Sequence, residues 1–165
     1  MTLSITLEES YKGTSREISV GVKRLKLNLK PGSYTGWKLK LKGYGQRGNT
    51  EDLNGDLIVT VNVLPHDFYI KDNLGLHIVK EIDLYDAMLG GEGELDIFGD
   101  KLKFNIPACT QNTSSLRLKG KGFPQYNNPE TRCDVYVRIM VSLPSSLTDE
   151  ERDLFIQLKN LKQQK

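Results

Sequence analysis

Two stretches of the chain, 36-GWKLKLKGYGQ-46 and 113-TSSLRLKGKGF-123, follow one pattern: leucines alternate with polar residues, and Lys-Gly-x-Gly comes next. Corresponding positions are 77 residues apart, and so are Gly13 and Gly90. At this spacing the sequence aligns with itself over residues 5–45 without a gap. A register shared over so long a stretch indicates a duplicated module, and two copies are too few for a solenoid. We therefore expect two small domains in tandem.

Most of each copy alternates apolar and polar residues, which is the period of a strand with one buried face. Residues 25–29 and 57–63 follow this rule in the first copy, and residues 102–106 and 135–141 follow it in the second. Each copy also has a short segment that ends in glycine and is long enough for one helical turn. The predicted fold class is mainly β, with two tandem small β-sandwich domains that each carry a short helix. The predicted divisions are 1–72, 73–146 and a C-terminal amphipathic helix at 147–165.

The C-terminal segment has a helical pattern of its own. Thr148 and Glu151 form a T-x-x-E capping box, and acidic residues fill the first turn. Apolar residues then recur at helical spacing. A helix of this length is unstable alone, so its apolar face packs either on its own chain or against a second copy of the protein. For a homodimer, the predicted dimerisation residues are Leu154, Phe155, Leu158 and Leu161.

Composition sets the broad class. The chain has 165 residues, of which 38% are hydrophobic and 27% charged, as in soluble globular proteins. No apolar run approaches the ~20 residues of a membrane span, and the N-terminus lacks the features of a secretory signal. Cys109 and Cys133 have no metal-ligand spacing and are interpreted as reduced thiols. We expect a cytoplasmic protein with no metal site and no membrane partner.

The net charge of +2 conceals an uneven distribution. Residues 16–47 contain nine Lys or Arg and one acid, whereas residues 50–100 contain twelve acids and two basic residues. Such a field can steer acidic partners toward one end of the molecule. The alternative is that alternating strands simply turn their lysines to water.

No catalytic pattern is present in the sequence. Residues 43–48 spell GxGxxG, but an acidic, polar loop and a strand follow instead of the helix that a dinucleotide site requires. His66 and His77 lie in no nucleophile or metal motif, and neither cysteine has an identifiable base. We predict no enzyme activity and no cofactor.

Several motifs together resemble one family. LEESYKG at 7–13, the junction PHDFYIKDN at 65–73 and the two L-K-G-x-G segments are similar to the C-terminal region of DnaJ-type co-chaperones. Residues 7–73 resemble the first C-terminal domain of that family, and residues 82–155 resemble the second. The cysteine-rich zinc module is missing, which matches the zinc-free, curved-DNA-binding-protein-A-like class.

The resemblance implies a function and a site. In this family the first domain binds unfolded polypeptides in a shallow apolar groove for delivery to a DnaK-type ATPase, and a C-terminal helix joins two arms into a dimer. Ile18 and Val20 share a face in REISVG, so both fit a groove floor, although ordinary core positions are the alternative. The second copy has Leu95 and Ile97 at the equivalent positions, so a groove there is not excluded. Carried over by motif, the peptide-binding residues are Leu3, Ile5, Arg16, Ile18, Val20 and Tyr69.

Two further expectations accompany the resemblance. No His-Pro-Asp triplet occurs and no J domain precedes Met1, so the chain is expected to be a client-binding part that does not by itself stimulate the partner's ATPase. The basic tract from Lys23 to Lys42 could instead contact the phosphates of DNA, or it could capture an acidic C-terminal tail of the partner chaperone.

Overall fold

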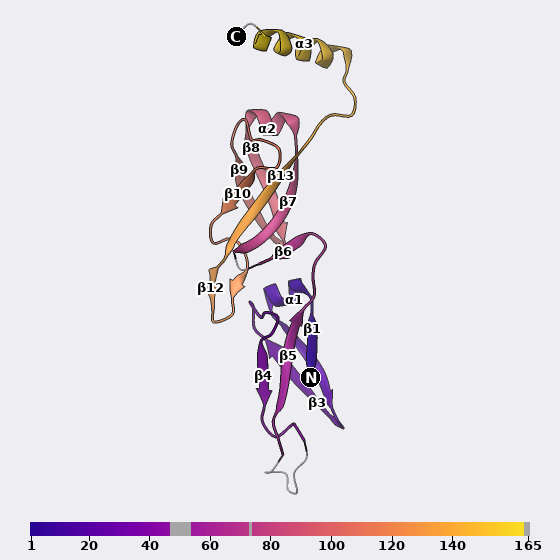
Figure 1. Cartoon of the computed structure of the whole chain (residues 1–165), viewed down its shortest axis with the longest axis vertical. Coiled ribbons are helices and arrows are strands. Elements are labelled where there is room, and N and C mark those ends of the chain that lie inside the picture. Colours follow the sequence, from indigo (N-terminus) through magenta and orange to yellow (C-terminus); the bar gives the residue numbers. More distant parts are fainter. Residues whose placement is uncertain (47–53, 73, 164–165) are drawn as a thin grey trace.

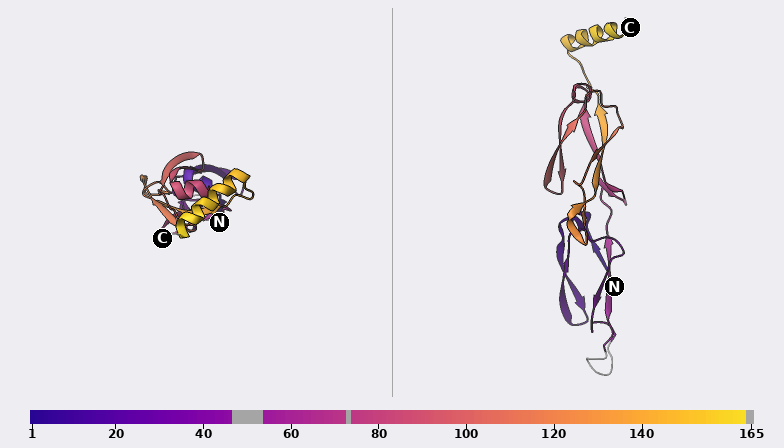
Figure 2. Two further views of the ribbon diagram at one scale, coloured as in Figure 1. Left: turned by 90° about the horizontal axis from the view of Figure 1, so that it is seen from above. Right: turned by 90° about the vertical axis from the view of Figure 1, so that its left-hand side faces the viewer.

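The computed structural model describes residues 1–46, 54–72 and 74–163. The fold is mainly β, as predicted: two β domains lie end to end, and a helix lies beyond the second (Figure 1). The view from the side shows the same elongated arrangement (Figure 2). Arg47 and Gly48 of the glycine motif lie outside the described residues, as do Asn73 of the predicted junction and the last two residues of the predicted C-terminal helix.

The first domain is a small sandwich. One layer is a three-stranded sheet in the order β1 (Thr2–Ile5), β5 (Leu57–Val63), β4 (Lys38–Leu41). The other layer is the hairpin of β2 (Thr14–Val20) and β3 (Lys23–Leu29). β1 runs parallel to β5, and β4 runs antiparallel to it. Apolar residues at alternate positions point into the space between the layers, as the period of two requires.

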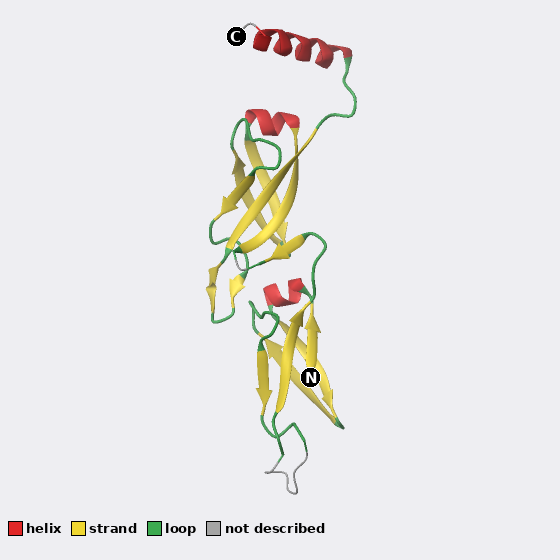
Figure 3. Cartoon of the chain, viewed as in Figure 1, coloured by secondary structure: helices red, strands yellow, loops and turns green. Residues whose placement is uncertain are grey.

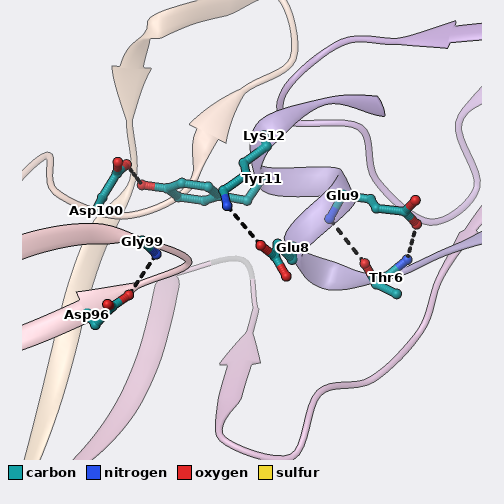
Figure 4. Close-up of polar contacts among 8 residues, drawn as sticks. All are labelled: Thr6, Glu8, Glu9, Tyr11, Lys12, Asp96, Gly99 and Asp100. Atoms are coloured by element: carbon teal, nitrogen blue, oxygen red, sulfur yellow. Dashed lines mark hydrogen bonds and ion pairs between the residues drawn. The ribbon is translucent and has the colours of Figure 1, made fainter. Parts of the chain in front are cut away.

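A short helix, α1 (Leu7–Lys12), connects β1 to β2. The Glu9 amide donates to the Thr6 hydroxyl at 3.1 Å and the Thr6 amide donates to the Glu9 carboxylate at 2.9 Å, so the helix begins with a capping box (Figure 4). It ends at Gly13, whose φ of +80° suits a residue without a Cβ. The predicted short helix is therefore confirmed.

The second domain repeats this plan. Its larger sheet has the order β10-β13-β7-β6, and its second layer is the hairpin of β8 and β9. β7 runs parallel to β13 as β1 does to β5, and α2 follows β7 as α1 follows β1, so each short helix lies at the same end of its domain (Figure 3). A two-stranded hairpin of β11 and β12 lies between β10 and β13. The bounds are β6 (Tyr69–Lys71), β7 (Gly75–Asp83), α2 (Leu84–Leu89), β8 (Gly91–Ile97), β9 (Asp100–Ile106), β10 (Ser115–Leu118), β11 (Pro124–Gln125), β12 (Asn128–Arg132) and β13 (Asp134–Ser142).

The strand β6 differs from the sequence-based division of the chain. Residues 69–71 fall within the range predicted for the first domain, yet they pair antiparallel with β7, with Tyr69 opposite Ile78. Pairing with a long neighbouring strand satisfies backbone groups that a free linker would leave to water. The second sheet thus begins before the predicted boundary.

The two domains share a core at their junction. The largest apolar cluster contains the second domain's interior and also Leu7 and Tyr11 of α1, whereas the rest of the first domain holds two small clusters. The Tyr11 ring lies 5.2 Å from the Phe98 ring and 5.3 Å from the Phe123 ring, measured between centroids. The Tyr11 hydroxyl donates to the Asp100 carboxylate at 2.7 Å (Figure 4) and accepts from Arg132 at 2.5 Å. α1 therefore belongs to one domain by sequence and contributes to the core of the other.

A second contact crosses the junction beside α1. The Tyr126 ring, at the tip of the β11–β12 hairpin, lies 4.7 Å from the Trp37 ring of the first domain. The hairpin also passes so close to Gly32 that a Cβ there would lie 2.5 Å from the Pro124 carbonyl oxygen. Gly32 is thus required by a close backbone approach as well as by its φ of +84°.

The C-terminal helix α3 (Asp149–Gln163) lies apart from both sandwiches (Figure 1). Its predicted capping box is confirmed, since the Thr148 amide donates to Glu151 at 2.8 Å and the Glu151 amide donates to Thr148 at 3.2 Å. None of its described residues is buried; Leu154, Leu158 and Leu161 are exposed and Phe155 is half-buried. No described helix has the length and apolar character needed to cross a bilayer.

Candidate functional site

The candidate site is the open side of the first sandwich, between β1 and β2. β5 pairs with one edge of β1, and within the described residues no strand pairs with its other edge. The hairpin of β2 and β3 faces β1 across the core, because Leu3 of β1 packs against the cluster that contains Ile18. An unpaired strand edge beside apolar side chains can accept an extended peptide as an additional strand.

The four apolar residues predicted for this site differ in burial. Ile5 is 1% exposed and Ile18 is 4% exposed, so both serve as core. Leu3 and Val20 are only half-buried and pack over the same cluster from β1 and β2. Leu3 and Val20 therefore supply the accessible apolar surface, while Ile18 supports it from beneath.

Arg16, on the same strand as Ile18 and Val20, is held by an ion pair with α1. Its guanidinium lies 2.7 Å from the Glu9 carboxylate, at the start of α1. The hydrogen bond from Arg16 lowers the pKa of Glu9, and the Thr6 amide lowers it further. Arg16 keeps about half of its side chain in solvent, so it remains available to the polar groups of a ligand.

Tyr69 lies apart from Leu3 and Val20. Its hydroxyl donates to the Asp96 carbonyl oxygen of β8 at 2.5 Å, and its ring lies 4.7 Å from the Phe98 ring, so it packs against the second domain. Burial raises the pKa of Tyr69, and the nearby negative charge of Asp96 raises it further. Tyr69 also lines a pocket of about 460 Å³ at the domain junction, together with residues such as Leu7, Val63 and His66. None of the other five predicted peptide-binding residues lines that pocket.

A family comparison identifies the fold. The sequence model of the DnaJ C terminal domain matches residues 1–144. The chain belongs to this family. Both β domains lie within the matched residues, and the exposed helix α3 follows them.

Curated DnaJ proteins are similar over most of the chain. Chaperone protein DnaJ from Bartonella quintana is 36% identical over 138 residues, which is 83% of this chain and 36% of that protein. Chaperone protein DnaJ from Desulfitobacterium hafniense is 35% identical over 147 residues, 89% of this chain and 38% of that protein. Chaperone protein DnaJ 2 from Thermus thermophilus is 32% identical over 156 residues, 94% of this chain and 54% of that protein. The chain therefore spans about a third to a half of these DnaJ relatives.

The sequence did not reveal the aromatic residues of the junction. Tyr11, His66, Phe98 and Phe123 form ring contacts around Tyr69 or with one another in this DnaJ C-terminal region. A signal was present in the repeat, because the alignment places Phe98 opposite Gly21 in the other copy. A large aromatic residue that is present in only one copy indicates a packing contact that only that copy makes.

The outer faces of the two hairpins differ in charge. On β8–β9, Lys101 lies 3.5 Å from Glu94 and Lys103 lies 3.9 Å from Glu92, so acids balance the lysines. On β2–β3, the equivalent hairpin of the first domain, Arg24 and Lys26 stand opposite Ser19 and Glu17, and neither forms an ion pair with a described acid. The first domain thus presents an unbalanced basic face.

Proposed function

We propose that the chain binds non-native polypeptide segments on the open side of β1 and β2. A segment would lie along β1 as an added strand and place apolar side chains on Leu3 and Val20. The observation that supports this proposal is the half-buried apolar pair beside a strand edge that no described strand occupies. Backbone pairing reads no sequence, which suits a chaperone that must accept many clients.

The expected affinity is modest. Covering one or two client side chains contributes about 1.5–3 kcal/mol each, and backbone pairing contributes further. Association costs at least several kcal/mol in lost freedom. The surplus is small, so we expect weak binding, with a Kd no tighter than about micromolar, which corresponds to about −8 kcal/mol. Weak binding favours release, which a protein that passes its client onward needs.

We propose that the recipient of the client is a DnaK-type ATPase chaperone. Sequence similarity supports this proposal, because the similar proteins are named chaperone protein DnaJ. We propose also that two copies associate through α3, whose leucines are exposed in the single chain. Two open sides in one dimer would raise the apparent affinity for a long client by local concentration.

Paired substitutions test the client site. Leu3→Ser with Val20→Ser removes the accessible apolar pair and leaves the buried Ile18 in place. The matched control is Leu89→Ser, which removes an exposed apolar side chain from α2 at the far end of the second domain. We expect the double variant to bind a labelled unfolded client at least tenfold more weakly and to lose suppression of its aggregation. Equal protection by the double variant and the wild type would refute the assignment.

A second candidate function follows from the basic face of β2–β3. We propose that Arg24 and Lys26 bind an acidic segment of a protein partner, since neither forms an ion pair with a described acid. Charge reversal of both residues should then abolish binding of an acidic peptide without affecting an apolar client. Binding of duplex DNA that weakens steeply with salt would point to nucleic acid instead.

A further inference from the structure

A pocket of about 460 Å³ lies at the junction of the two domains. One side is formed by α1, by residues 33–35 and by the end of β5 in the first domain, and the other side is formed by β6 (Figure 1). Small-molecule sites are commonly of this size and often lie at domain interfaces. Leu3, Arg16 and Val20 do not line this pocket, so it is separate from the proposed client surface.

The walls of the pocket are apolar and aromatic. On the side of the first domain, Leu7 is buried and Val63 is half-buried. The rings of His66 and Tyr69 also line the pocket and lie 4.9 Å apart, measured between centroids. The Tyr69 hydroxyl donates to the Asp96 carbonyl oxygen of β8 at 2.5 Å, and this bond holds the ring in place. The pocket therefore offers a preformed apolar surface to a flat ligand.

Two lining residues have a hydrogen-bond donor for which the described residues provide no acceptor. The His66 Nδ1 accepts from the Phe68 amide at 3.1 Å, so the neutral ring carries its proton on Nε2 and can donate it. The Thr35 hydroxyl accepts from the Val63 amide at 3.0 Å, and its own proton can still be donated. A ligand that accepts hydrogen bonds would satisfy both groups.

The charged residues of the lining favour a negatively charged ligand. Lys71 forms no ion pair with an acid in the described part of the chain. Asp72 is the one acid among the described lining residues, and its Oδ1 already accepts from the amides of Leu74 and Gly75 at 2.8 and 2.9 Å. Its Oδ2 lies 2.9 Å from the Nε2 of His77. The Lys71 ammonium therefore remains available to an anion.

We propose that the junction pocket binds a small carboxylate with a flat aromatic body, and that this ligand stabilises the docked arrangement of the two domains. The aromatic body lies against the apolar walls. The carboxylate accepts from Lys71, His66 and Thr35, and a charged donor such as an ammonium binds it more strongly than neutral donors do. Because both domains line the pocket, a ligand at a hundredfold its Kd shifts the equilibrium toward the docked arrangement about a hundredfold.

The experiment titrates the protein with 2-naphthoate and follows the backbone amide resonances by nuclear magnetic resonance. The same titration with the neutral 2-naphthamide measures the contribution of the negative charge. We expect one 2-naphthoate per chain, with resonances of both α1 and β6 shifting along one binding curve. The amide should bind at least tenfold more weakly, because it cannot form the charged hydrogen bond.

Substitution of Lys71 tests the anion site directly. Lys71→Gln removes the charge and keeps most of the stem, so it should weaken 2-naphthoate binding at least tenfold and change 2-naphthamide binding by about twofold or less. Lys103→Gln is the matched control, because Lys103 is an exposed lysine of β9 that does not line the pocket. Equal 2-naphthoate binding by Lys71→Gln and the wild type, or no binding by the wild type at millimolar 2-naphthoate, would overturn the proposal.

Further variants separate this pocket from the client surface and test its dependence on docking. Leu3→Ser with Val20→Ser should bind 2-naphthoate as the wild type does, and a loss of binding would assign the probe to the client surface instead. Tyr11 does not line the pocket but joins α1 to the second domain, so Tyr11→Ala should bind 2-naphthoate at least tenfold more weakly. If Tyr11→Ala does not fold, Tyr126→Ala, which removes the ring that contacts Trp37, should show a loss in the same direction. Unchanged affinity in the folded variant would refute the link between the ligand and domain docking.

Discussion

Tyr11 joins the first domain's helix to the second domain's core, so its replacement tests whether the two domains unfold together. Its ring is 4% exposed and contacts the rings of Phe98 and Phe123. Truncating a buried aromatic residue to alanine costs about 3–5 kcal/mol. Tyr11→Ala should therefore lower the free energy of unfolding of the second domain by that amount.

Tyr11→Phe separates the hydroxyl from the ring. The hydroxyl bonds Asp100 and Arg132, whose side chains are 63% and 37% exposed in the folded chain. Water can therefore replace the lost contacts, and the variant should lose only about 1 kcal/mol. A larger loss would mean that the polar contacts, rather than ring packing, stabilise the junction.

Urea unfolding followed by two probes distinguishes coupled from independent domains. Trp37 is the only tryptophan, and its fluorescence reports on the first domain and on its junction contact with Tyr126. Far-ultraviolet circular dichroism reports on the strands of both domains. In the wild type the two transitions should coincide, and in Tyr11→Ala they should separate. Met88→Ala is the matched control, because Met88 is the repeat equivalent of Tyr11 and is 47% exposed; it should change stability by about 0.5 kcal/mol or less. Coincident transitions in Tyr11→Ala, or equal effects of both variants, would refute the shared core.

Three other outcomes are expected. Ile18→Ser should cost about 2–4 kcal/mol of stability, whereas Val20→Ser should cost about 1 kcal/mol or less yet weaken client binding; the reverse order in a urea and anisotropy series would show that the accessible residue has been misidentified. Burial, with the hydrogen bond to Asp100, raises the pKa of Tyr11 above its ordinary 10.0. The neutral phenol therefore stabilises the fold fully below pH 10, and this contribution is lost as the pH rises through the folded pKa. The free energy of unfolding measured at pH 9 and pH 11 should show this loss in the wild type and not in Tyr11→Phe. Deleting residues 147–165 should convert a dimer into a monomer in light scattering, and an intact chain that already runs as a monomer contradicts the dimerisation proposal.

The repeat predicted most of the architecture because topology is conserved between copies even where side chains are not. Alternation located the long strands, and the glycines at 13 and 90 located the ends of both short helices. β6 was not predicted as part of the second sheet, because three residues are too short to show a period. Its place in the sheet depends on backbone pairing with β7, and the local sequence of β6 does not encode that tertiary interaction.

The site was predictable only in part. The pattern in REISVG correctly places Ile18 and Val20 on one face of β2, but period alone does not distinguish a residue at the centre of a sandwich from one at its open edge. Whether a residue of β2 is fully buried depends on how far the opposite sheet, β1-β5-β4, extends over it. Tyr69 illustrates the same limit, since its sequence neighbours belong to the junction while its hydroxyl contacts β8, 27 residues further along the chain.

The two short helices show how duplicated elements acquire different roles. α1 and α2 share their position in the fold and their terminal glycine, yet Leu7 and Tyr11 are buried while Met88 and Leu89 are exposed. The difference follows from chain order: the second domain lies directly beyond α1 and offers Phe98 and Phe123 to it. Both aromatic residues occur only in the second copy, where the repeat alignment pairs them with Gly21 and Gln46. Phe98, which stands where the first copy has Gly21, packs against the rings of both Tyr11 and Tyr69. The ring contacts of Tyr11 and of Tyr69 therefore both depend on one aromatic residue, Phe98, and Phe98→Gly should weaken the packing of α1 and of β6 on the second domain together.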